Sequence, residues 1–389
     1  MTSYAAGPYA CMIFADLGAE VIKVEPPKVG EPFRFFGGGY QAAYFIALNR
    51  NKKSLALNLK STEGQEVMLK LLEESDIFVE NLGPGVVDRL GLSYQTVSTR
   101  NPQLIYCSIK GYGKGPYEKR PAFDPVVEAE SGLMSVMGEP DRSPVRLGGP
   151  MIDYVTGTFS VIAVMGALLK RNAYGKGEKI EVNLFESAVS MMTQSLNIYA
   201  LYKHLPEKLG SGWGPYQVFN ASDGFVFVGV SSDKHWERFC DAFKVSREIK
   251  ERYALRVARD ENDAELERLV AKMVANLRVS EVVKRLTNAG VPGAPVNTMK
   301  EVLEDPHLQS RKSLISLTPD LEVTHTEDFR VSVNPMLPIR SSYYNPSITN
   351  TWIPAQKLGN HSVEILRNLG YSEPQIEDLR KRKIVWPYI

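Results

Sequence analysis

The chain has few cysteines and histidines for its length, and neither residue type is arranged as a metal site. Among 389 residues there are 3 cysteines and 5 histidines. Cys11, Cys107 and Cys240 lack the spacing of metal ligands, so we expect no metal ion and buried thiols in a reducing compartment. All the histidines lie in the second half of the chain, so any chemistry in the first half must proceed without imidazole.

A strong charge of one sign and a bilayer-length hydrophobic run are also missing. The formal net charge is +1, which gives no reason to expect nucleic acid or a membrane surface as a partner. We find no signal peptide, and no apolar run spans a bilayer without charged or polar residues. With 43% hydrophobic and 23% charged residues, the composition is typical of a soluble globular protein, for which we expect a cytoplasmic location.

Helices and strands alternate in the first half, which predicts a doubly wound, Rossmann-like α/β domain with a parallel sheet. The chain is too long for one ordinary core. We expect a large domain from residues 1–200 and 330–389, and a smaller α+β domain at 215–325. The pattern predicts strands at 19–25, 54–59, 76–80, 104–109, 179–184 and 224–230, and helices at 7–18, 62–74, 154–170, 185–204, 233–243, 263–276, 279–289, 362–369 and 374–382, with a short helix beginning at Ser93 and a capping box of Thr62 and Gln65.

A doubly wound unit normally begins with a strand, and none precedes the first helix here. Its absence leaves a sheet edge uncovered beside the strand at 20–25. We expect either that the natural gene product starts upstream, or that the fold contains a local gap filled by water or by another segment.

Asp153 is the most informative candidate for chemistry. It lies between the turn Gly148-Gly149-Pro150 and a mostly apolar helix. The carboxylate is therefore expected in the first helical turn, where free backbone N–H groups and the helix dipole favour its ionised form. Two roles stay open at this point: a helix N-cap, which aspartate commonly fills, and a catalytic carboxylate.

Several short motifs follow one another along nearly the whole chain. They are AGPY (6–9), ADLGAEVIKVEP (15–26), NRNKKS (49–54), NLGPG (81–85), DRLG (88–91), SIKGYG (108–113), PAFD (121–124), SGLM (131–134), AGVPGAPV (289–296) and LGNH (358–361). In order and spacing they resemble the class III CoA-transferases, the family that contains formyl-CoA and carnitine CoA-transferases and the alpha-methylacyl-CoA racemases.

The resemblance implies a nucleophilic aspartate at Asp153. In the family this carboxylate attacks an acyl-CoA donor to give a mixed anhydride, an aspartyl-CoA thioester follows, and CoA ends on a carboxylic acid acceptor. Coenzyme A is then a substrate, and no permanently bound cofactor is expected. A glycine loop covers the anhydride in the family, and Gly210, Gly212 and Gly214 match it, although they are equally compatible with an interdomain linker. The resemblance further implies a homodimer of two interlocked ring-like monomers.

The resemblance also implies a site for CoA, whose phosphates require cations beside backbone turns. Arg34, Arg89 and Lys110 match family positions that contact CoA, and we expect them at the carboxyl ends of the strands. The other candidates for contacts to CoA are Ala5, Ala6, Leu57, Asn58, Leu59, Lys60, Asn81, Leu82, Gly83, Gly111, Tyr112, Gly113 and Asp124.

Two residues favour a transferase over a racemase. A racemase needs two acid/base groups on opposite faces of the carbon next to the thioester. Phe123 stands where the racemase branch has a histidine, and Gln217 stands at the expected glutamate position. A racemase and a non-catalytic CoA-binding protein, with Asp153 only a cap, stay as alternatives.

The identities of the donor and the acceptor stay open. Small dicarboxylates, branched acids and aromatic acids are all compatible with the sequence. Candidates for the substrate pocket, or equally for the core, are Tyr4, Tyr40, Tyr44, Phe45, Tyr154 and Trp213.

Overall fold

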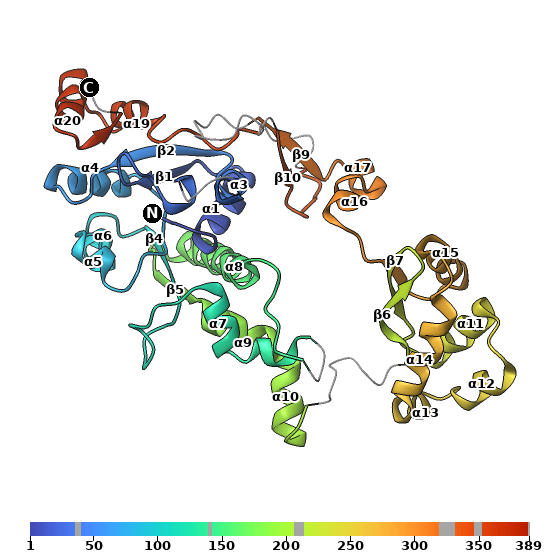
Figure 1. The fold of residues 1–389 in the computed structure, drawn as a ribbon. Coiled ribbons are helices and arrows are strands. Elements are labelled where there is room, and N and C mark those ends of the chain that lie inside the picture. The colour runs from blue at the N-terminus through green and yellow to red at the C-terminus, as the bar shows by residue number, and fades with distance from the viewer. Residues whose placement is uncertain (36–39, 139–141, 206–213, 319–330, 346–351, 388–389) are drawn as a thin grey trace. The chain divides into compact units, whose positions relative to one another are not determined.

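A computed structural model describes residues 1–35, 40–138, 142–205, 214–318, 331–345 and 352–387 (Figure 1). The chain has a mixed α/β fold and divides into two units. The larger unit contains Met1–Met137, Pro144–Thr193 and Gln309–Ile389, and the smaller unit contains Gly138–Ser143 and Gln194–Leu308.

The larger unit is built mainly from alternating helices and strands. It begins with α1 (Ala6–Asp16), β1 (Val21–Glu25), α2 (Pro32–Phe35), α3 (Tyr40–Leu48), β2 (Lys52–Leu57), α4 (Thr62–Glu73), β3 (Ile77–Glu80), α5 (Val86–Arg89), α6 (Tyr94–Arg100) and β4 (Ile105–Lys110). It continues with α7 (Asp124–Glu130), the 3-10 helix η1 (Leu133–Val136), α8 (Met151–Tyr174), β5 (Lys179–Asn183) and α9 (Leu184–Met191). The C-terminal part adds β9 (Leu314–Leu317), β10 (Ser332–Pro335), α19 (Ser362–Asn368), α20 (Glu373–Lys381) and β11 (Val385–Trp386).

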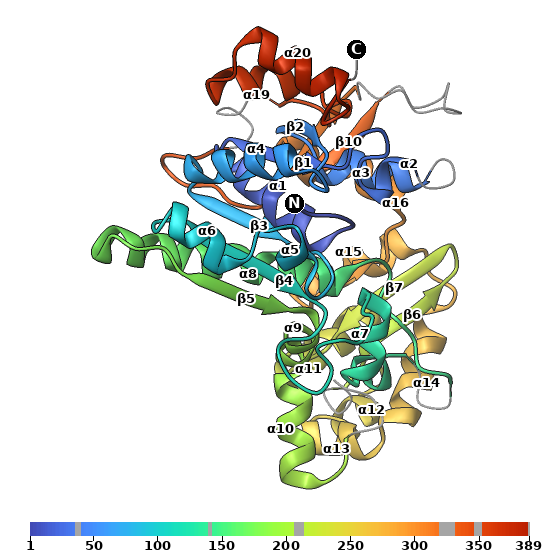
Figure 2. The same cartoon turned by 90° about the vertical axis from the view of Figure 1, so that its left-hand side faces the viewer.

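The strands of the first half pair in parallel, as the alternation of elements predicts. β1 pairs with β2, and β3, β4 and β5 form a second parallel set, which lies side by side in Figure 2. The C-terminal end of the chain returns to the first set, because β11 pairs antiparallel with β2. In Figure 1, α19 lies near the blue strand β2 although it belongs to the C-terminal part of the chain.

A gap separates the two parallel sets. Among the described residues, β1 and β3 are both edge strands of their sheets. A cavity of about 460 Å³ is lined by residues of both strands and by Phe14, Met68 and Leu72. It lies beside β1, where the missing first strand predicts a local gap. A natural start upstream of Met1 stays a prediction.

Three local expectations need correction or confirmation. The capping box of Thr62 and Gln65 is wrong, because Ser61 is the N-cap of α4 and accepts the Gly64 N–H, while the Gln65 amide donates to the Leu59 carbonyl. Ser93 caps α6 as predicted. The single helix predicted over 185–204 is interrupted at Met192 and forms α9 and α10 (Thr193–Tyr202).

Helix α8 is the central helix of the larger unit. It packs along α1 and against β4 and β5, and it buries Val161, Val164 and Ala167 in the core. Its length and composition alone would allow it to cross a membrane. Its packing against the sheet gives its buried face a core role instead.

The smaller unit combines an antiparallel sheet with helices. Its strands are β6 (Tyr216–Ala221), β7 (Gly224–Gly229) and β8 (Gly293–Pro295), with β7 in the middle. Its helices after α10 are α11 (Asp233–Phe243), α12 (Arg247–Arg252), α13 (Arg256–Glu261), α14 (Asp263–Val274), α15 (Val279–Ala289) and α16 (Met299–Leu303), and α17 (Pro306–Ser310) crosses its boundary. Trp236, Phe239 and Leu286 are fully buried in its separate core.

Candidate active site

Asp153 lies in the first turn of α8 but does not cap the helix. The N-cap is Pro150, the helix begins at Met151, and no side chain makes a capping hydrogen bond there. The alternative that Asp153 serves as the N-cap is therefore wrong. The Gly149-Pro150 turn starts the helix earlier than that reading requires, which leaves the Asp153 carboxylate outside the cap.

A second carboxylate holds the backbone of Asp153. Asp124 is the first residue of α7, and its Oδ2 accepts the Asp153 N–H at 2.9 Å. The Asp124 residue is only 4% exposed. A side chain of α7 thus satisfies one of the free N–H groups at the start of α8 and fixes the position of the candidate nucleophile.

Burial, and to a smaller extent the nearby charge of Asp124, raise the pKa of Asp153 to about 7. The expectation that the helix terminus keeps this acid readily ionised needs correction, because desolvation and a like charge outweigh it. Asp124 also has a pKa raised to about 7, first by burial and then by Glu128. A carboxylate with a raised pKa is more basic, which suits a nucleophile or a base.

Helix α1 approaches α8 one turn after Asp153. A Cβ placed on Gly157 would lie 2.7 Å from the carbonyl oxygen of Ala6, so only glycine permits this contact. Ala5 and Ala6 are both buried. Ala6, a predicted CoA contact, therefore packs directly against the helix of Asp153.

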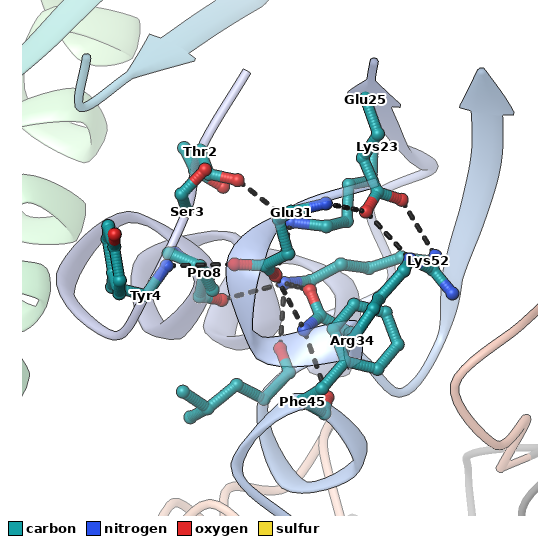
Figure 3. A network of polar contacts seen from close by, with 12 residues as sticks. Thr2, Ser3, Tyr4, Pro8, Lys23, Glu25, Glu31, Arg34, Phe45 and Lys52 are labelled. Atoms are coloured by element: carbon teal, nitrogen blue, oxygen red, sulfur yellow. Dashed lines mark hydrogen bonds and ion pairs between the residues drawn. The ribbon is translucent and has the colours of Figure 1, made fainter. Parts of the chain in front are cut away.

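A buried network of charges fixes the segment before α1 (Figure 3). Glu31 accepts the Tyr4 N–H at 2.8 Å and pairs with Lys23 at 2.8 Å, and Lys23 donates to the Thr2 carbonyl at 2.9 Å. Lys52 donates to the Pro8 carbonyl at 2.8 Å. Burial lowers the pKa of the Lys52 amine to about 7.

Asn81, a predicted CoA contact, clamps the same segment from the end of β3. Its side chain accepts the Ser3 N–H at 2.8 Å and donates to the Ser3 carbonyl at 2.7 Å. Tyr4 then adopts a positive φ of 62°. For a bulky residue this conformation is strained, and the paired contacts at Ser3 and Tyr4 hold it.

Aromatic rings connect Asp124 to the N-terminal segment. Tyr4 packs edge-on against Phe33 and Phe123, with ring centroids 5.4 and 5.8 Å apart. Phe33 stacks on Tyr44 at 5.4 Å. Tyr4 and Tyr44 keep 38% and 37% of their surface exposed, which suits a pocket wall.

Two further aromatic candidates have core contacts. Phe45 is only 1% exposed and belongs to the core. Tyr154 pairs with Tyr9 at 4.7 Å. Trp213 and the side chain of Tyr40 lie outside the described residues.

The three cationic candidates lie at or after the carboxyl ends of β1, β3 and β4, which belong to two sheets, and they differ in their partners. Arg34 follows β1, is buried, and its guanidinium makes two hydrogen bonds of 2.7 Å to Glu25. Lys110 ends β4 and pairs with Glu80 at 2.8 Å. Arg89 ends α5, is exposed, and has no acidic partner in the described ranges. Of the three, Arg89 is the most available for a phosphate, and the roles of all three stay predictions.

The remaining CoA candidates occupy turns and strand ends. Leu57 is buried in the core, Leu59 packs beside it, and Asn58 and Lys60 form the turn after β2, with Lys60 exposed. After β3, Leu82 donates its N–H to Glu80, and Gly83 is exposed. After β4, Tyr112 donates its hydroxyl to Glu130, and Gly113 lies beside Asn183. Gly111 admits no side chain, because a Cβ would lie 2.1 Å from that of Ala122.

The predicted glycine loop is described only at its end. Gly210 and Gly212 lie outside the described residues. Gly214 has a φ of +108°, and a Cβ there would lie 2.9 Å from Nε of Arg259. Its role as an active-site cover stays a prediction.

Sequence reasoning missed Glu128, Glu31 and Phe33. Glu128 could have been found, because it lies four residues after Asp124 and so on the same face of a helix. The buried pairing of Glu31 with Lys23 depends on long-range contacts that no local pattern reveals.

Comparisons with known proteins identify the family of the chain. Residues 1–355 match the sequence model of CoA-transferase family III. The chain is 34% identical to succinyl-CoA:glutarate CoA-transferase of Mus musculus, over 97% of this chain and 87% of that protein. It is 31% identical to succinyl-CoA–D-citramalate CoA-transferase of Chloroflexus aurantiacus, over 98% of this chain and 95% of that protein.

Solved structures give the same assignment. The crystal structure of a CAIB/BAIF family protein from Brucella suis superposes with a TM-score of 0.81 at 32% identity, covering 95% of this chain and 97% of the other. The family match spans most of the chain, and the relatives named as CoA-transferases exceed 30% identity over nearly all of it. The chain is therefore an enzyme that belongs to CoA-transferase family III.

Proposed function

We propose that Asp153 is the nucleophile that carries CoA from an acyl-CoA thioester to a free carboxylic acid. The observation that carries this proposal is the placement of Asp153 in the first turn of α8, with its backbone held by Asp124 and its side chain not used as a cap. A carboxylate held in a fixed position can attack a carbonyl carbon.

The proposed reaction consists of two exchanges at Asp153. The carboxylate attacks the thioester carbonyl, and CoA thiolate leaves as a mixed anhydride forms. The thiolate then attacks the aspartyl carbonyl, which releases the donor acid and leaves an aspartyl-CoA thioester. The acceptor carboxylate attacks this thioester and expels the thiolate, so a second mixed anhydride forms. The thiolate then attacks the acceptor carbonyl of this anhydride and frees the Asp153 carboxylate.

The structure of α7 argues against the racemase alternative. Phe123 is the N-cap of α7 and is 57% exposed, so a side chain without an exchangeable proton stands next to Asp124. The binding-protein alternative required Asp153 to be a cap, which it is not. A transferase accounts for both features.

We further propose succinyl-CoA as donor and a short dicarboxylic acid as acceptor. Support comes from the names of the relatives, which include succinyl-CoA:glutarate and succinyl-CoA–D-citramalate CoA-transferases. For the CoA moiety we propose Arg89 and Lys60 as exposed phosphate contacts.

A homodimer completes the proposal. One face of α8 exposes Phe159, Ile162, Met165 and Leu169, spaced three or four residues apart. Such an apolar stripe is typical of a surface that another chain covers. A monomer in light scattering at micromolar concentration would exclude the interlocked dimer.

Trapping the intermediate tests the nucleophile. We expect protein incubated with succinyl-CoA, without an acceptor, to gain the mass of a CoA or acyl adduct, and hydroxylamine to convert Asp153 into a hydroxamate. Asp153→Asn should form no adduct, whereas Asp260→Asn, on an exposed helix of the smaller unit, should behave as wild type. Incorporation of solvent deuterium next to the thioester without any adduct would instead favour the racemase.

A further inference from the structure

Two buried carboxyl groups behind Asp153 each have one oxygen without a hydrogen-bond donor in the described part of the chain. These atoms are Oδ1 of Asp124 and Oε1 of Glu128. The two residues are 4% and 1% exposed. Because they are four residues apart on α7, their carboxyl groups lie on one face of the helix and come within hydrogen-bonding reach of each other.

The other oxygen of each group holds the chain that leads into α8. Oδ2 of Asp124 accepts the Asp153 N–H at 2.9 Å, and Oε2 of Glu128 accepts the Leu147 N–H at 2.8 Å. The same pair thus holds both ends of residues 147–153. These two oxygens each accept a fixed backbone N–H, and the other oxygen of each carboxyl group is left without a donor in the described part of the chain.

Two ionised carboxylates cannot face each other in a buried site at low cost. Without water or a cation, both oxygens are acceptors only, and the like charges repel. A single proton between them removes one charge and supplies the missing donor, as in other carboxyl pairs that share one proton. Burial and the neighbouring Glu128 raise the pKa of Asp124 in the direction that this requires.

Among the residues that the structure describes, the groups around the pair include no cation that would remove the need for this proton. On α8, Asp153 and Tyr154 face Asp124. On α7 itself, Glu130 is engaged by Arg120 and Tyr112. The packed helix α9 contributes Glu186, whose carboxylate lies near Gly113, and η1 has no titratable side chain. Arg146, the cation next to Leu147 in sequence, is exposed.

We propose that Asp124 and Glu128 share one proton, and that this carboxyl pair is a positioning device that holds Asp153 and tunes its ionisation. The proton lies between Oδ1 of Asp124 and Oε1 of Glu128, so the pair presents one negative charge to Asp153 instead of two. The effect on catalysis rests on the proposed nucleophilic role of Asp153, whereas the shared proton does not.

Infrared spectroscopy tests the shared proton directly. At pH 6 exposed carboxylates are ionised, whereas Asp124, whose pKa is raised to about 7, keeps the shared proton. In an Asp153→Asn background at this pH, without substrate, we expect a C=O band of a protonated carboxylic acid that shifts in deuterium oxide. Adding Glu128→Gln or Asp124→Asn should abolish the band, because an amide N–H then replaces the shared proton. Glu118→Gln, an exposed acid, should leave it unchanged. Absence of the band in the Asp153→Asn protein would overturn the proposal, whatever the outcome of the adduct experiment.

The pH dependence of kcat/KM tests the tuning of Asp153. Glu128→Gln confines the negative charge to Asp124, which lies closer to Asp153 and raises its pKa. The acidic limb of the pH profile of kcat/KM should therefore move to higher pH by about half a unit to one unit. Asp124→Asn moves the charge to the more distant Glu128, so the limb should move to lower pH by a similar amount. A purely structural role would lower activity at every pH without moving the limb. Shifts in the same direction, or none, would overturn the tuning role.

Discussion

The carbonyl oxygen of Ala6 on α1 lies so close to Gly157 on α8 that a Cβ on residue 157 would lie 2.7 Å from it. The ring of Tyr9 and the backbone N of Ala10 lie within 3.3 Å of the same position. The backbone of α1 therefore contacts helix α8 directly at Gly157. This contact sets the distance between the N-terminal segment and the helix of Asp153.

We predict that Gly157→Ala destabilises the protein and lowers CoA transfer. The added methyl group would force α1 and α8 apart, and overpacking of this kind costs about 1–3 kcal/mol in the free energy of unfolding. Urea denaturation and steady-state kinetics would measure both effects. Gly166→Ala on the same helix is the matched control, because no atom lies within 4 Å of its Cβ position. It should be neutral or stabilise by up to about 1 kcal/mol, and equal effects of both substitutions would contradict the prediction.

Asp153→Asn is predicted to stabilise the fold at pH 8. The pKa of Asp153 is raised in the folded protein to about 7 from 3.8, so its ionisation opposes folding increasingly as pH rises from about 4 to 7. An amide carries no such cost. We expect the free energy of unfolding to increase by about 1–3 kcal/mol at pH 8, after discounting for the partial exposure of Asp153. Chemical denaturation of both proteins across pH 4–8 checks this. The gain should shrink toward pH 4, and a variant less stable than wild type at pH 8 would show that the carboxylate is favourably solvated.

Arg89→Ala is predicted to weaken binding of acyl-CoA without blocking chemistry. Loss of one charged hydrogen bond to a phosphate should raise KM about tenfold, with little change in kcat. The difference from wild type should decrease at high salt, because exposed charges are screened. Arg247→Ala, whose side chain is 90% exposed on α12 of the smaller unit, should leave KM unchanged. An unchanged KM for Arg89→Ala would remove this residue from the CoA site.

Local sequence patterns predicted most helices and strands of the larger unit, because the residues that start, stop and pack these elements lie close together in the sequence. The apolar spacing in α4 and the serine before α6 depend only on residues within a turn or two. The same patterns missed the capping of α4 by one residue, and they did not reveal the break at Met192. The resemblance to a family indicated a catalytic role for Asp153, which helix and strand propensities alone could not indicate.

Tertiary structure decided the partners and the electrostatics of these residues. The sequence placed Asp153 in the first turn of a helix, but only the folded chain brings Asp124 to its N–H and raises its pKa. Likewise the sequence presents Arg34 as a free cation, whereas folding pairs it with Glu25 in the interior. Residue identity and spacing determine which helix or strand forms, because those forces act between near neighbours. Desolvation and ion pairing depend on segments that meet only when the chain is folded, so the ionisation of this site is a property of the tertiary structure.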